Sequence, residues 1–206
     1  MSQFFQIHTE NPQVRLVRQA VEIIRGGGVV VFPTDSTYAL GCRLGDKDAL
    51  ARIRQIRQLD ERHNFALLCR DLSDLATYAK VDNMAYRLLK HATPGPYTFI
   101  LQATSEVPRR LLHPRKKTVG LRVPDNVITQ AILEDLGEPM MSVTMTMPGD
   151  EHPLMDPYDI RNLLERRVDL VIDGGFCGIE LTSVIDLIED TPVILREGLG
   201  DMSLFA

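Results

Sequence analysis

The sequence predicts an α/β fold in which helices flank one mixed β-sheet. Three observations support this prediction. Segments with helical periodicity alternate with short apolar runs that are typical of buried strands. The composition, 44% hydrophobic and 25% charged residues, is that of an ordinary globular chain. No internal repeat, low-complexity segment or linker interrupts the sequence, so we expect residues 1–206 to form a single domain.

The first half of the chain opens with a predicted helix over 13–25. Apolar residues recur there at spacings of three and four, and three consecutive glycines follow. The all-apolar run Val29–Phe32 fits a strand that is buried on both faces. By the same criteria we expect helices over 47–59, 72–79 and 82–91, and a strand over Phe65–Cys69.

The second half continues the alternation with more strands than helices. We expect helices over Ile128–Leu136 and about 157–167, and an exposed loop over 147–156. The predicted strands are Tyr97–Leu101, Val119–Val123, Pro139–Thr144, Leu170–Asp173, Val184–Ile188 and Val193–Arg196. So many short strands separated by helices predict a largely buried sheet.

Several functional classes are excluded or disfavoured by what the sequence lacks. No apolar stretch approaches the roughly 18 residues of a membrane span, and the N-terminus does not resemble a signal peptide. We therefore expect a cytoplasmic protein with no membrane partner, in which Cys42, Cys69 and Cys177 are reduced thiols. The five histidines are scattered, and no Walker or Rossmann pattern occurs. We expect no metal site and no tightly bound cofactor.

The first candidate for chemistry is the segment Pro33–Gly41, which follows a buried strand. Thr34, Ser36, Thr37 and Tyr38 supply hydroxyl groups, and Asp35 adds a carboxylate. Ligands often bind at such strand ends in open α/β sheets, where hydroxyls can contact phosphate oxygens. The alternative is a turn stabilised by local bonds between side chains and backbone.

The second candidate is Arg122, a charged residue in an apolar strand. A buried charge is costly unless it is paired, so its partner is Asp125, another carboxylate, or a bound anionic ligand. Two later segments, Thr182–Asp186 and Ile194–Gly198, place a hydroxyl or an arginine beside other strand ends. The pattern alone leaves these alternatives open.

Six segments, in this order, together resemble the YrdC-like family of threonylcarbamoyl-adenylate synthases. They are residues 26–41, 93–101, 118–125, 169–175, 182–186 and 194–198. The resemblance implies one α/β domain with a twisted mixed sheet around a concave, positively lined cleft. It also implies an activity that combines L-threonine, bicarbonate and ATP into threonylcarbamoyl-AMP, which serves tRNA modification. Some members of the family bind double-stranded RNA.

The resemblance assigns roles residue by residue. Matching positions place Thr34 and Ser36 at the threonine and nucleotide site, Thr118 against the nucleotide, and Arg122 on the threonine carboxylate. Thr182 matches a substrate-site serine, and Arg196 matches an arginine near the ATP phosphates. This set, with Arg57 and Thr144 from the two altered motifs described next, forms the predicted substrate and nucleotide site; no catalytic residue is assigned.

Two motifs depart from the family pattern. Where the synthases carry Lys-x-Arg-Pro, this chain reads Arg57-Gln58-Leu59-Asp60, which keeps one of the two cations. Where they carry Ser-x-Asn, it reads Thr144-Met145-Thr146, which keeps the hydroxyl and loses the amide. Each charged contact to a phosphate contributes about 1.5–3 kcal/mol. We therefore expect at most weak synthase activity, with Arg62 as a substitute cation.

The distribution of charge supports a phosphate-bearing ligand despite a net charge of −5. Residues 43–122 carry sixteen basic and eight acidic groups, whereas residues 123–206 carry four basic and seventeen acidic groups. Arg62, Arg115, Lys116 and Lys117 in the basic part are candidate phosphate contacts. We expect a cleft that binds RNA, double-stranded or tRNA, or a nucleotide such as ATP with or without magnesium, and L-threonine as a further ligand. The alternative is an active threonylcarbamoyl-AMP synthase.

Overall fold

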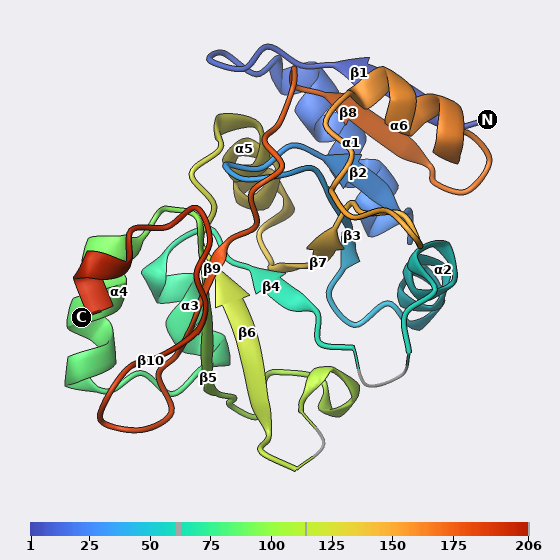
Figure 1. Ribbon diagram of the computed structural model, residues 1–206. Helices are drawn as coiled ribbons and strands as arrows, with labels where there is room; N and C mark the ends of the chain where they lie inside the picture. The colour runs from blue at the N-terminus through green and yellow to red at the C-terminus, as the bar shows by residue number, and fades with distance from the viewer. Residues whose placement is uncertain (61–62, 114, 206) are drawn as a thin grey trace.

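The computed structural model describes residues 1–60, 63–113 and 115–205, and it has the predicted single-domain α/β architecture. One sheet of ten strands runs through the chain in the order β1-β8-β2-β3-β7-β4-β6-β5-β9-β10 (Figure 1). The pairs β1–β8, β2–β8, β4–β6 and β5–β9 are parallel, and the other five pairs are antiparallel. The sheet is therefore mixed, as predicted.

The strands and helices alternate along the chain. The strands are β1 (Gln3–Gln6), β2 (Val30–Phe32), β3 (Ala39–Arg43), β4 (Ala66–Leu68), β5 (Tyr97–Gln102), β6 (Thr118–Arg122), β7 (Met140–Thr144), β8 (Leu170–Asp173), β9 (Ser183–Asp186) and β10 (Val193–Arg196). The helices are α1 (Val14–Arg25), α2 (Lys47–Arg57), α3 (Leu72–Tyr78), α4 (Asn83–Ala92), α5 (Val127–Leu136) and α6 (Pro157–Leu164), with 3₁₀ turns η1 (Arg109–Leu111) and η2 (Met202–Phe205). Among the described residues, no helix is long and apolar enough to cross a membrane.

The structure differs from the sequence prediction at β1, β3 and two helix ends. β3 lies in a segment that the sequence analysis treated as a binding loop, and it pairs with β2 and β7. The helix predicted to reach residue 59 ends at Arg57, because Gln58 adopts a left-handed backbone with φ of 51°. The helix predicted to reach residue 167 ends at Leu164.

Short acidic or amide side chains fix where most helices begin. The Asp46 carboxylate accepts hydrogen bonds from the backbone N–H groups of Asp48 and Ala49, and the Asn126 side chain accepts one from Thr129. Asp71, Asp82 and Asp156 cap α3, α4 and α6 in the same way. Each cap satisfies backbone N–H groups that have no partner within the helix.

The two faces of the sheet are buried in two hydrophobic clusters. On β2 the side chains alternate, so that Val31 joins one cluster while Val30 and Phe32 join the other. Helices α1 and α5 lie side by side and pack on the face of Val30 and Phe32 (Figure 1). Helices α2, α3, α4 and α6 contribute to the opposite cluster. β2 is thus apolar and buried on both faces, as its sequence predicts.

The pairing of the strands shows which residues lie on the same face of the sheet as helices α1 and α5, from β2 to β9. Phe32 lies opposite Ala39, and Ala39 lies opposite Thr144 on β7. The same face continues through residues 142 and 66 to Gly120, and through 122 and 98 to 184. Because the α1–α5 cluster includes no residue of β5 or β9, this end of the face is available for a cavity.

Candidate functional site

A cavity of about 450 Å³ lies over the β5, β6 and β7 part of the α1–α5 face. Its floor is made by small or β-branched residues of these strands and of the neighbouring strands β3 and β4. Ala39, Ala66 and Gly120 have little or no side chain, which leaves the floor low. Hydroxyl groups, guanidinium groups and one imidazole stand around it: Thr37, Thr98, Ser142, Thr144, Thr146, Thr182, Arg57, Arg122, Arg196 and His63. Among the described residues, the lining contains no carboxylate.

The turn between β2 and β3 lies beneath one wall of the cavity. Thr34 Oγ1 donates to the carbonyl of Thr37 at 2.6 Å and accepts from the backbone N–H groups of Ser36 and Thr37, each at 3.2 Å. Thr34 and Ser36 are buried and do not line the cavity. The local bonds between side chains and backbone that the sequence offered as one alternative are present, and Thr37 of the same segment lines the cavity.

This turn holds Arg122. One guanidinium nitrogen, Nη2, donates to Thr34 Oγ1 at 3.1 Å and to Ser36 Oγ at 3.0 Å, and it pairs with the Asp35 carboxylate. The partner of Arg122 is therefore Asp35. Asp125 contributes instead its backbone N–H, which donates to Asp35 Oδ2 at 3.1 Å. Burial lowers the pKa of Arg122, and Asp35 opposes that shift.

Arg196 lies on β10, and its guanidinium group is hydrogen-bonded to Thr182, the residue that precedes β9. Its Nε donates to the Thr182 carbonyl at 2.9 Å, and its Nη2 donates to Thr182 Oγ1 at 3.1 Å. That hydroxyl also lies 2.9 Å from Thr98 Oγ1 on β5. Burial lowers the pKa of Arg196, and the charge of Arg122 lowers it further. Two arginines from distant strands therefore repel each other across one cavity.

Arg57 brings a third guanidinium from the end of α2. Burial lowers its pKa, and its Nε is buried without a hydrogen-bond partner in the described part of the chain. His63 lies beside it in the lining, and the pKa of His63 is lowered by burial and by the charge of Arg57. The positive charge of Arg57 is thus partly shielded from water in this corner of the cavity, which costs free energy unless an anion pairs with it.

The structure brings together five of the predicted substrate and nucleotide residues as cavity lining: Arg57, Arg122, Thr144, Thr182 and Arg196. Thr118 is buried at the start of β6, where its carbonyl accepts from the His113 N–H, and it does not line the cavity. The candidate Arg62 lies outside the described residues.

Arg115, Lys116 and Lys117 are exposed in the connection between β5 and β6 and do not line the cavity. The expectation that they adjoin the cleft is therefore not met by its lining. The backbone N–H groups of Arg115 and Lys116 donate to His113 Nδ1, which fixes the shape of this connection. They form a separate basic surface.

Sequence reasoning missed several lining residues, among them His63, Asn64 and Thr98. Thr98 carried a usable signal, because it alternates with buried Tyr97 and Phe99 along β5 and therefore points to the other face. His63 and Asn64 follow α2 in an irregular segment, where no periodicity indicates a direction.

The described residues do not fit a protein-held magnesium ion. Magnesium is usually bound through one or two carboxylates together with substrate phosphates. The described lining supplies arginines and hydroxyls instead, and no group of three His, Cys, Asp or Glu side chains in the described chain could hold a metal. We therefore assign no step to a metal.

Comparison with known proteins places the chain among relatives of known name. The family model Sua5/YciO/YrdC, described as telomere recombination, matches residues 22–198. YciO of Escherichia coli K12 is 60% identical over 205 residues, with all of both chains covered, and the crystal structure of E. coli YciO superposes with a TM-score of 0.96.

Two more distant relatives carry names that describe an activity or a ligand. A threonylcarbamoyl-AMP synthase of Nitrosococcus oceani is 31% identical over 77% of this chain and 85% of its own. A crystal structure of Pyrococcus abyssi Sua5 complexed with L-threonine is 27% identical with a TM-score of 0.87, covering 95% of this chain and 57% of that one. These matches confirm the predicted resemblance: the chain belongs to the Sua5/YciO/YrdC family, and it is related to threonylcarbamoyl-AMP synthases.

Proposed function

We propose that the cavity binds the phosphate groups of a nucleotide, with ATP as its ligand. The observation that carries this proposal is the convergence of Arg57, Arg122 and Arg196 from three separate elements on one cavity. Arginine is the residue best suited to charge-assisted contact with phosphate oxygens. A ligand with several negative charges offsets both the repulsion between these arginines and the cost of their burial.

Hydroxyl groups complete the match to such a ligand. Thr98, Ser142, Thr144 and Thr146 stand around the same cavity and can donate to phosphate or ribose oxygens. Equilibrium dialysis with labelled ATP tests the proposal. We expect saturable binding that inorganic pyrophosphate displaces, because the phosphates supply the main contacts. Binding that adenosine displaces and pyrophosphate leaves unchanged would overturn it.

A second function, synthesis of threonylcarbamoyl-AMP, is favoured by the relatives. The Sua5 structure complexed with L-threonine shares this fold at a TM-score of 0.87. We propose at most weak activity of this kind, because Leu59 and Asp60 stand in place of a cation and a proline, and Thr146 in place of an asparagine. Release of pyrophosphate from ATP that requires both L-threonine and bicarbonate measures it, with heat-treated protein as the control.

RNA binding is a further part of the proposal, supported by the exposed basic surface of Arg115, Lys116 and Lys117. Phosphate contacts release counterions, so affinity for duplex RNA or tRNA must fall as salt increases. Filter binding over a salt series checks this, and affinity independent of salt would contradict phosphate contact. We place these activities in the cytoplasm, where the predicted thiols remain reduced.

A further inference from the structure

Strand β10 ends the sheet with an exposed apolar edge. In the part of the chain that the structure describes, β10 pairs only with β9, and the strand order stops there. All four of its residues are exposed, and Val193, Ile194 and Leu195 retain 50%, 37% and 57% of their accessible surface. Unpaired edge groups on an apolar strand are a template for pairing with another extended segment.

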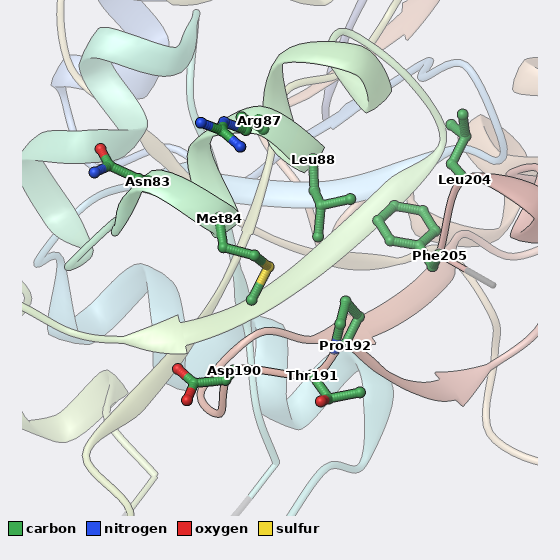
Figure 2. A pocket seen from close by; sticks show the side chains of 9 residues that line it. All are labelled: Asn83, Met84, Arg87, Leu88, Asp190, Thr191, Pro192, Leu204 and Phe205. Carbon is green, nitrogen blue, oxygen red and sulfur yellow. The ribbon is translucent and has the colours of Figure 1, made fainter.

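An apolar pocket of about 590 Å³ lies at the start of this edge. In Figure 2, Met84 and Leu88 from α4 face Pro192 and Phe205 across the pocket, and Asp190 stands at its rim. Leu204 from η2 completes the apolar lining and is itself 40% exposed. The pocket is large enough for one or two large side chains, and a segment that extends the sheet at β10 passes beside it.

The charged side chains that flank β10 in the sequence are acidic, whereas α4 contributes one cation, Arg87, to the lining of the pocket. Glu189, Asp190, Glu197 and Asp201 are all exposed on the segments that precede and follow β10. The one cation of this stretch, Arg196, is held by Thr182 in the cleft. These four carboxylates belong to the strongly acidic last part of the chain, and none of them lines the nucleotide cavity.

We propose that β10 and the neighbouring pocket bind an extended, basic segment of a partner protein. The segment adds a strand to β10 through backbone hydrogen bonds, inserts a large apolar side chain between Met84 and Pro192, and pairs lysine or arginine residues with Glu189 and Asp190. The exposed apolar edge accounts for the added strand, and the pocket accounts for the inserted apolar side chain. The carboxylates of Glu189 and Asp190 account for the positive charge of the partner segment. This inference does not rest on nucleotide binding.

The added strand would lie next to the nucleotide cavity. Leu195 and Arg196 line that cavity from β10, because a bulge between Ile194 and Arg196 turns consecutive side chains toward it. A partner on β10 therefore borders the nucleotide cavity.

The test uses a synthetic ten-residue peptide in which lysine alternates with valine and one central valine is replaced by phenylalanine. Fluorescence anisotropy measures its binding to the full chain, and amide chemical shifts locate it. We expect shifts confined to residues 189–197 and the pocket. Val193→Lys should weaken binding by about tenfold or more, because it sets like charges against each other. Val14→Lys, at a site on α1 that is 63% exposed, should leave binding unchanged.

Charge exchange provides the second arm. The double variant Glu189→Lys/Asp190→Lys should no longer bind the lysine-containing peptide. It should instead bind a peptide with glutamate in place of lysine more tightly than the wild type does. Equal binding of both peptides to the wild type, or shifts spread away from β10, would overturn the proposal. So would sedimentation of the chain alone as a dimer that Val193→Lys dissociates, since the occupant would then be a second copy. Urea unfolding of each variant serves as the control for folding.

Discussion

Arg122 and Asp35 form an ion pair in which both side chains are almost fully buried, at 9% and 8% exposure. Thr34, Asp35 and Ser36 together surround one end of the guanidinium, and the Asp125 N–H satisfies the other carboxylate oxygen. The β2–β3 turn and β6 are therefore locked together beneath the cavity. Arg122 is thus held in place by contacts within the protein itself.

The first prediction concerns the stability of this pair. Asp35→Asn leaves a buried guanidinium without its counter-charge, and breaking a buried pair from one side costs about 3–5 kcal/mol. Urea unfolding should show a loss of this size, whereas Asp35→Asn combined with Arg122→Met should lose less than the sum of the single changes. A loss below about 1 kcal/mol for Asp35→Asn would show that the pair carries no such energy.

The second prediction concerns the altered motif after α2. Leu59→Arg with Asp60→Pro restores the synthase pattern next to Arg57, adding a charged phosphate contact. We expect threonine- and bicarbonate-dependent pyrophosphate release to rise by about ten- to a hundredfold. The matched control, Leu59→Met with Asp60→Pro, restores the proline without the charge. If both variants release pyrophosphate at the same rate, the missing cation is not what limits the reaction.

The third prediction concerns His63 and pH. Burial and Arg57 lower the pKa of His63 below its usual 6.5, and Arg54 adds to this while Asp60 opposes it. The unfolded chain therefore takes up a proton at higher pH than the folded chain. The contribution of His63 to stability is present above pH 6.5 and is lost as the pH falls through that value toward the folded pKa.

The measurement is urea unfolding of the wild type and His63→Gln between about pH 7.5 and 5.5. The wild type should lose more stability than His63→Gln over this range, because glutamine binds no proton. Exposed His152→Gln serves as the control and should follow the wild type. Parallel curves for the wild type and His63→Gln would contradict the proposed burial of His63.

Most strands and helices could be predicted from the sequence because the apolar residues that they bury form a recognisable pattern within each segment. Val29–Phe32 is apolar throughout, and the sheet buries β2 on both faces. β3 could not be predicted in the same way, because Gly41 interrupts the run of apolar side chains in its sequence. A side chain at Gly41 would lie 2.6 Å from the Phe32 ring and 2.8 Å from the Met141 carbonyl oxygen. That requirement arises from neighbouring strands, which the local sequence does not show. β1 depends likewise on its pairing with β8.

The residues of the cavity could likewise be predicted from the sequence only in part. Arg122 could be singled out because a charge in an apolar strand needs a partner, yet its pairing with Asp35 depends on packing between β2 and β6. The roles of Arg57 and Arg196 came from the family resemblance, and the approach of Arg196 to Arg122 depends on a register that spans β5, β6, β9 and β10. Thr34 and Ser36 are predicted to contact the ligand; in the structure they do not line the cavity, and their hydroxyls accept hydrogen bonds from Arg122.

Calorimetric titration of ATP into the wild type, Arg57→Met, Arg196→Met and the surface variant Arg18→Met tests the central claim most directly. If the convergent arginines hold the phosphates, each cavity variant loses a contact of about 1.5–3 kcal/mol, which corresponds to about ten- to 150-fold weaker binding. Arg18→Met should bind as the wild type does. Binding by Arg57→Met and Arg196→Met at wild-type affinity, or no heat from the wild type itself, would contradict a phosphate site in this cavity.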